Sequence, residues 1–274
     1  MINNSIAKLM LGRHSVRRKV RQIIAKKFFP YDIRIGYGAI DRPHYGYCVL
    51  QAAKLAKSLG HKKVSVIEFG VAGGNGLINL EMHAREVEKL LDIHIQIFGF
   101  DTGGGLPLPK DYRDLPYYWK PGFFAMDVEK LREKLTRSEL ILGDVAETLP
   151  SFLQKYTPAP VGAVFMDLDF YSSTKHALNL FDLHRTRVLP RAFIYFDDII
   201  GNSTVLYNEY TGVLLAINEF NSNHSEQKLC KATHLVTLPY QETWGHQIYI
   251  YHDFMAADYC KFVSEDETQL PLNP

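Results

Sequence analysis

From Lys63 onward, short runs of β-branched and aromatic residues alternate with longer stretches of helical periodicity. This alternation predicts strand–helix–strand units, which place parallel strands in one sheet and helices on both of its faces. We expect strands at 63–69, 95–100, 138–142, 161–167 and 191–197. We expect helices at 43–59, 75–91, 127–136, 145–156, 171–186 and 203–223.

Two last apolar runs, 233–238 and 246–252, predict closing strands with no helix between them. The predicted fold is therefore α/β and Rossmann-like: a doubly wound, mostly parallel seven-stranded sheet with an antiparallel last strand. A length of 274 residues without a linker or repeat favours one main domain. We assign it to 43–255, after an N-terminal helical extension at 1–42 and before a tail at 256–274.

Composition excludes several classes of protein. No apolar run reaches the roughly 18 residues of a membrane span. Three cysteines at irregular spacing predict neither a disulfide framework nor a zinc site, which favours a cytoplasmic protein.

The N-terminal segment is basic, because eight Lys and Arg residues precede the first acidic residue, Asp32. Without those eight, 23 basic residues face 30 acidic ones, a difference of −7. Apolar residues at helical spacing within the same segment predict a basic amphipathic helix. Such a helix could contact an anionic membrane surface, or pack on its own domain or on another subunit of a homo-oligomer. We expect no nucleic-acid partner.

Ligands of open α/β sheets bind at the carboxyl ends of the strands. After the first strand, Glu68 precedes a turn with glycines at 70, 73, 74 and 76 and Asn75, which can approach an anionic ligand closely. Asp101, followed by Thr102, ends the second strand and suits the hydroxyls of a ribose. Asp144, followed by Val145, suits an adenine, or caps the next helix. Together they predict an adenosine-containing ligand, which carries either a nicotinamide or a sulfonium group.

The next two strand ends carry paired carboxylates. Asp167 and Asp169 follow the fourth strand, and Asp197 and Asp198 follow the fifth. Neighbouring carboxylates at one sheet edge can bind a hard divalent cation such as Mg²⁺.

A short-chain dehydrogenase is an alternative, because Tyr171 and Lys175 match its Tyr-x-x-x-Lys pair. The acidic Glu68 before the glycine turn and the spacing of about 100 residues between the two motifs argue against it.

Five ordered blocks resemble class I S-adenosylmethionine-dependent methyltransferases, most closely the macrocin O-methyltransferase family. They are Glu68-x-Gly70-Val71-x-x-Gly74, Phe100-Asp101-Thr102 with Gly105-Leu106-Pro107, Gly143-Asp144 with Glu147-Thr148-Leu149-Pro150, Asp167-x-Asp169-x-Tyr171-x-Ser173-Thr174, and Asp197-Asp198. The resemblance implies S-adenosyl-L-methionine as cofactor and Asp167, Asp197 and Asp198 as ligands of Mg²⁺ or another divalent cation. Asp169 would support them or cap the following helix.

The resemblance further implies methyl transfer to a metal-activated hydroxyl of a sugar or glycosylated small molecule, with Asp167 accepting the proton. His44 and His246 are alternative bases. The aromatic-rich loop 103–126 is a candidate acceptor lid, and Tyr45 and Tyr47 could cover the cofactor. A non-catalytic cofactor-binding scaffold is the other alternative.

Overall fold

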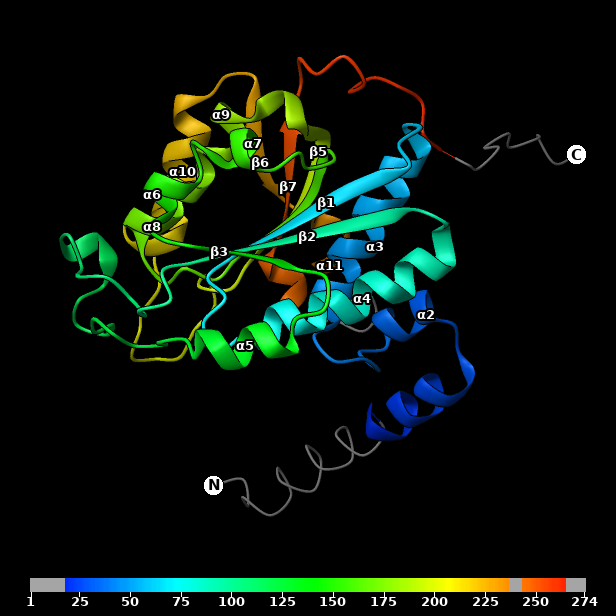
Figure 1. Ribbon diagram of the computed structural model, residues 1–274, viewed down its shortest axis with the longest axis horizontal. Helices are drawn as coiled ribbons and strands as arrows, with labels where there is room; N and C mark the ends of the chain where they lie inside the picture. The colour runs from blue at the N-terminus through cyan, green and yellow to red at the C-terminus, as the bar shows by residue number, and fades with distance from the viewer. Residues whose placement is uncertain (1–17, 237–242, 265–274) are drawn as a thin grey trace, which may run out of the picture.

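The computed structural model describes residues 18–236 and 243–264. Its centre is one seven-stranded sheet in the order β3-β2-β1-β4-β5-β7-β6 (Figure 1). The strands are β1 (Lys63–Phe69), β2 (His94–Asp101), β3 (Glu139–Leu142), β4 (Val161–Met166), β5 (Val188–Phe196), β6 (Gln227–Lys231) and β7 (Ile248–Asp253). β7 runs antiparallel to both of its neighbours, β5 and β6, whereas β1 to β5 are mutually parallel. The predicted Rossmann-like doubly wound fold is thus confirmed.

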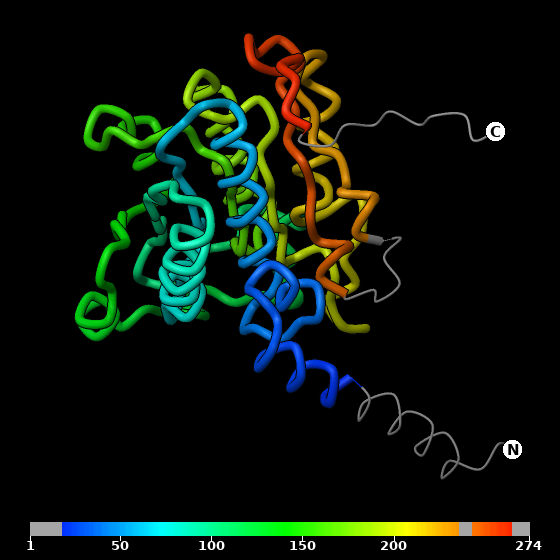
Figure 2. Tube along the Cα trace, turned by 90° about the vertical axis from the view of Figure 1, so that its right-hand side faces the viewer, coloured from blue at the N-terminus to red at the C-terminus, as the bar shows by residue number. Residues whose placement is uncertain are grey.

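Helices cover both faces of the sheet, as Figure 2 shows from the side. One core cluster packs against α2 (Tyr31–Gly36), α3 (Pro43–Ser58), α4 (Asn75–Leu91), α5 (Val128–Lys134) and α11 (Thr233–Val236). The other packs against α6 (Val145–Thr148), α7 (Phe152–Lys155), α8 (Tyr171–Leu178), α9 (Leu180–Leu183) and α10 (Gly212–Asn223). All six residues of β4 are buried, since a central parallel strand is covered on both faces.

The predicted strand at 233–238 is wrong. The edge strand β6 lies at Gln227–Lys231, and α11 follows at Thr233–Val236. Within β6, Gln227 and Leu229 are buried while Lys228 is only half-buried, the alternation of a strand with one face on the core. The remainder of the predicted strand, 237–238, lies outside the described residues.

Three predicted helices are shorter or broken. Pro150 separates α6 from α7, because proline lacks the N–H that would continue the helix. The helix predicted at 171–186 is divided into α8, α9 and a 3-10 turn (Arg185–Arg187). The helix predicted at 203–223 begins only at Gly212, because the Asn202 side chain accepts hydrogen bonds from the backbone of Thr204 and Val205 and forms a turn.

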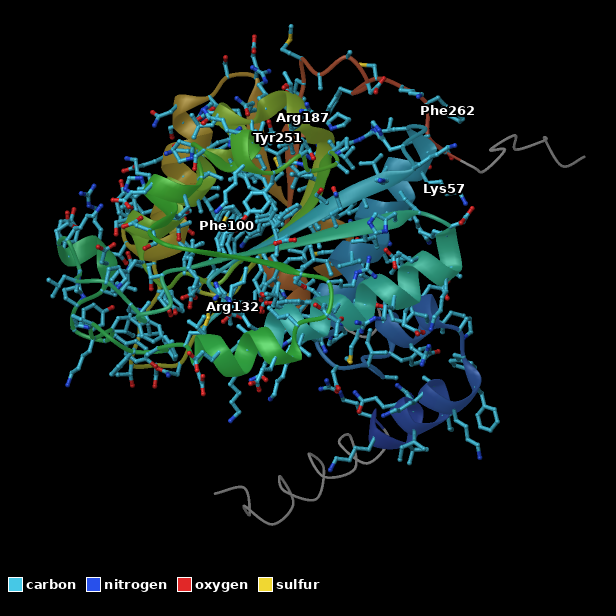
Figure 3. The ribbon with its side chains drawn as sticks, in the orientation of Figure 1. Lys57, Phe100, Arg132, Arg187, Tyr251 and Phe262 are labelled. Atoms are coloured by element: carbon cyan, nitrogen blue, oxygen red, sulfur yellow. The ribbon has the colours of Figure 1, made fainter. Side chains whose placement is uncertain are left out.

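The carboxyl ends of five strands meet in one row. Backbone hydrogen bonds join Gly143 to Asp101, Gly70 to Phe100, Asp167 to Phe69, and Asp197 to Met166, at 2.9 to 3.0 Å. The strand order reverses between β1 and β4, which is where ligands of such sheets bind. Figure 3 labels Phe100 near this edge and Phe262 near the opposite one.

The N-terminal extension is partly integrated with the domain. Residues 18–28 are helical, and Tyr31 and Ile35 of α2 are buried in the core. Within the described ranges, none of the helices combines the length and apolarity needed to cross a bilayer.

Candidate functional site

A cavity of about 310 Å³ opens at the row of strand ends. Its size is within the range of small-molecule pockets. Each of the five ordered sequence blocks named above contributes at least one residue to its lining. The lining residues include Gly70, Ala72, Asp101, Thr102, Leu106, Pro107, Trp119, Phe124, Asp144, Val145, Asp167, Asp169, Ser173, Asp197 and Asp198.

The glycine turn lies directly against the end of β4. Gly70 has a φ of +85°, and a Cβ at this position would lie 1.7 Å from the carbonyl oxygen of Asp167. Gly74, with a φ of +83°, is the N-cap of α4. Only glycine combines this backbone conformation with this close approach, so the turn and the carboxylate loop are fitted to each other.

Four of the predicted cofactor residues, Glu68, Gly73, Gly74 and Asn75, do not line the cavity. Glu68 is 1% exposed and accepts a 2.7 Å hydrogen bond from the Tyr45 hydroxyl. Its carboxylate lies below α4, where a Cβ on Gly76 would be 1.9 Å from Oε1. Glu68 supports the turn from the buried side, Gly73 and Gly74 form part of it and Asn75 begins α4; a direct contact with a cofactor stays a prediction for all four.

We expect Glu68→Gln to stabilise the protein at pH 8 but not near pH 4.5. Burial raises the pKa of Glu68 from its ordinary 4.5 to about 8. A carboxyl whose pKa is raised by folding contributes most to stability below pH 4.5, and that contribution is lost as the pH rises through 8. The free energy of unfolding of Glu68→Gln, relative to that of the parent chain, should therefore increase by up to about 1.4 kcal/mol per pH unit in this window.

Denaturant unfolding at several pH values measures this difference, with Glu129→Gln, an exposed carboxylate on α5, as the matched control. If the difference in the free energy of unfolding between Glu68→Gln and the parent chain were constant across that window, Glu68 would not be a buried carboxyl that keeps its proton in the folded protein.

Asp101 organises the turn and also faces the cavity. Its Oδ2 accepts hydrogen bonds from the backbone N–H groups of Val71 and Ala72, each at 2.9 Å. Its Oδ1 accepts a third, from Gly103 at 2.6 Å. A carboxylate has about four acceptor positions, so capacity remains for a hydroxyl of a ligand.

Asp144 combines the two roles that the sequence left open. It caps α6, since its side chain accepts a 2.8 Å hydrogen bond from the backbone N–H of Ala146. It also lines the cavity, together with the mostly buried Val145.

Asp167, Asp197 and Asp198 form a cluster suited to a metal ion. Each offers one carboxylate oxygen, and these oxygens lie within 4.8 Å of one another. The register of the sheet explains the arrangement, because Met166 of β4 pairs with Phe196 of β5 and the aspartates follow directly. Asp169 is mostly buried next to the cluster and also lines the cavity; it has a φ of +59°, and its backbone N–H donates to Asp198 Oδ2 at 2.9 Å.

The electrostatics of the cluster favour a cation. Burial, followed by the charges of Asp198 and Asp197, raises the pKa of Asp167 well above its ordinary value. Burial, followed by the charges of Asp198 and Asp167, raises the pKa of Asp169 to about 10. Like charges this close oppose ionisation, and a divalent cation would remove that penalty. The all-oxygen donor set fits Mg²⁺.

Three residues that the sequence reasoning missed hold the cluster in place. The hydroxyl of Tyr195 donates to Asp197, and that of Tyr207 donates to Asp198 at 2.9 Å. The Gln247 amide donates to the backbone carbonyl of Asp197 at 2.7 Å. Tyr195 could have been found, because two residues along a strand point to the same face. Tyr207 and Gln247 carry no such signal.

The aromatic loop lies over the cavity, where it was expected. Leu106, Pro107, Trp119 and Phe124 contribute an apolar wall. Asp114, which is 1% exposed, anchors the loop to the start of α8. Its carboxylate accepts hydrogen bonds from the backbone N–H and the hydroxyl of Ser172 at 2.8 and 2.9 Å.

Four further residues suggested by the sequence lie outside the cavity lining. Tyr45 is bonded to Glu68, and Tyr47 is bonded to His234 at 2.7 Å, so neither lines the cavity. His44 stacks on Tyr195, and burial lowers its pKa to about 3. His246 is exposed on a 3-10 turn (Thr243–Gln247). Neither histidine lines the cavity as a base would.

The pair that suggested a dehydrogenase lies outside the cavity. The Tyr171 hydroxyl donates a 2.7 Å hydrogen bond to Glu219. The Lys175 ammonium donates to the Tyr171 hydroxyl and to the Glu219 carboxylate. These side chains form a polar cluster on α8 and α10 and are absent from the described lining. A Tyr–Lys pair placed there cannot act on a ligand in this cavity.

Comparison with solved structures shows the same fold. CalS11, a calicheamicin methyltransferase, matches with a TM-score of 0.51 and 20% identity over 87% of this chain and 92% of its own. The apo structure of CalS11, a TDP-rhamnose 3'-O-methyltransferase, gives a TM-score of 0.46 and 19% identity over 87% and 94%. No protein-family model matches the chain. No curated protein matches it either.

Proposed function

We propose that the chain is a class I S-adenosylmethionine-dependent O-methyltransferase that uses a divalent cation. One observation carries the proposal: a glycine turn, a ribose-type carboxylate and a three-carboxylate cluster line a single cavity. The likeness in fold to a calicheamicin methyltransferase supports it. The dehydrogenase alternative loses its support because Tyr171 and Lys175 lie elsewhere.

In this proposal the first three strand ends bind the cofactor. Asp101 accepts a hydrogen bond from a ribose hydroxyl, while Asp144 and Val145 flank the adenine. Gly70 and Ala72 leave room for the methionine portion at the boundary with Asp167. S-adenosylmethionine, when bound, supplies an electrophilic methyl group. Alignment of that methyl with the acceptor would provide much of the acceleration, up to about 7–11 kcal/mol when well oriented.

Asp167, Asp197 and Asp198 would hold the cation. A divalent ion there would lower the pKa of an acceptor hydroxyl by several units. The backbone of Asp167 borders the glycine turn and its carboxylate belongs to the cluster, so we assign the hydroxyl proton to this residue. Tyr195 and Tyr207 keep the other two carboxylates oriented by donating to them.

The composition of the cavity lining is compatible with a sugar ring in the acceptor. Trp119 and Phe124 offer aromatic faces, which stack well on sugar rings. All charged residues among the described lining are aspartates: Asp101, Asp144, Asp167, Asp169, Asp197 and Asp198. In this proposal Asp167, Asp197 and Asp198 hold the cation and Asp101 binds the cofactor, so the aromatic faces are the part of the lining left to hold the sugar ring.

Transfer of a labelled methyl group tests the proposal. We expect transfer from S-adenosylmethionine to glycosides with free sugar hydroxyls, and loss of transfer after addition of a chelator. Undiminished activity with chelator would remove the cation from the mechanism. Cofactor binding without transfer to any glycoside would favour the scaffold alternative.

Tyr207→Phe should weaken the binding of Mg²⁺ by about 10- to 100-fold, because the hydroxyl that orients Asp198 is lost. Calorimetric titration with Mg²⁺ measures the affinity directly. Tyr210→Phe is the control, since Tyr210 is 78% exposed. Equal affinities of Tyr207→Phe and the parent chain would show that the phenol does not position the carboxylate.

A further inference from the structure

The helix at 18–28 contacts the domain through one narrow face. Ala25 is fully buried there, and the Gln22 side chain donates a 3.0 Å hydrogen bond to the Gly38 carbonyl. Figures 1 and 2 both show the rest of this helix extending away from the sheet and its covering helices.

Four apolar residues of the same helix are exposed. At about 100° per residue, Val20 and Ile23 lie opposite Ala25 and Ile24 lies about 100° from it, while Phe28, at the end of the helix, lies about 60° from it. They are 49, 67, 45 and 68% exposed, respectively. A helix that served only to cover its own domain would turn these side chains inward. These side chains stay largely exposed instead, although Ile23 borders a groove beside α2 and α4, so the apolar face is accessible to a partner.

Basic residues border this apolar face, and no acidic residue precedes Asp32. Lys19 and Lys26 lie on one flank and Arg21 on the other, while Lys27 lies within the face with its ammonium 5.4 Å from the centre of the Phe28 ring. An apolar stripe with basic flanks is typical of helices that lie in the interface of an anionic bilayer.

We propose that the helix at 18–28 docks the protein on an anionic lipid surface, with the apolar face in the acyl boundary and the flanking cations against the headgroup phosphates. Phe29 and Ile33, 38 and 43% exposed, extend the apolar surface toward α2. Symmetric pairing of two copies through this face is disfavoured. It would bring together two helices whose described part carries Lys19, Lys26 and Lys27 and no acidic residue, so that like charges would meet.

Sedimentation of the full chain with vesicles tests the proposal. We expect binding to phosphatidylcholine vesicles that contain one third phosphatidylserine, and little binding to pure phosphatidylcholine. Lys26→Gln combined with Lys27→Gln should weaken binding by about 30-fold. Ile23→Ser combined with Ile24→Ser should weaken it by more than about tenfold.

Leu90→Ser provides the matched control, because Leu90 is an exposed apolar residue, 46% accessible, on α4. It should leave vesicle binding unchanged, and thermal melts should show that all variants are folded. Absence of binding, or equal binding to both vesicles, would overturn the proposal. Self-association in sedimentation velocity that Ile23→Ser with Ile24→Ser removes, without vesicle binding, would identify a second copy as the partner instead.

Discussion

Asp167→Asn is expected to reduce methyl transfer by about 10²- to 10⁴-fold, because the substitution removes both a cation ligand and the proposed proton acceptor. The shape of the side chain is kept, so the turn at Gly70 should be preserved. The affinity for S-adenosylhomocysteine should therefore change little. Initial rates of methyl transfer and a calorimetric titration with S-adenosylhomocysteine measure the two quantities separately.

Asp258→Asn is the control for this change, since Asp258 is an exposed carboxylate remote in sequence from the cluster. A variant Asp167→Asn that transferred methyl groups at the parental rate would exclude Asp167 from the chemistry. Loss of cofactor binding together with activity would instead assign it a structural role.

Gly70→Ala is expected to destabilise the protein by about 3–5 kcal/mol, the sum of a left-handed backbone and a steric overlap. Gly70 has a φ of +85°, and the added methyl would lie 1.7 Å from the Asp167 carbonyl oxygen. Relief of that overlap must separate the glycine turn from the carboxylate loop. Denaturant unfolding would measure the loss in stability, and cofactor affinity should fall with it.

Gly73→Ala is the matched control in the same turn. No heavy atom lies within 4 Å of a Cβ built there, and its φ is not in the left-handed region. The change should alter stability by less than about 0.5 kcal/mol. Similar losses in the two variants would contradict the close fit between the turn and the end of β4.

The sequence predicted the central sheet because its buried strands are continuous apolar runs separated by amphipathic helices of ordinary length. α4 begins and ends at the predicted residues, 75 and 91, because the glycine turn marks its start. The edge strand β6 escaped prediction because its alternating, lysine-containing sequence is short and only one of its faces is buried.

Within the site, the residues that could be predicted from the sequence are those that lie at the end of a strand. Asp101, Asp167 and Asp197 follow parallel strands in register, so their proximity could be inferred. The direction of Glu68 could not, because whether its carboxylate faces the ligand or the underside of α4 depends on packing with Tyr45 and Gly76. Tyr207 reaches Asp198 from a loop whose path no periodicity specifies.

Calorimetric titration of the purified chain with S-adenosylhomocysteine tests the central proposal most directly. The proposal predicts saturable binding at one site, weakened severely by Asp101→Ala and unaffected by Asp258→Asn. No heat of binding with S-adenosylhomocysteine or S-adenosylmethionine, together with saturable binding of NADPH, would contradict it.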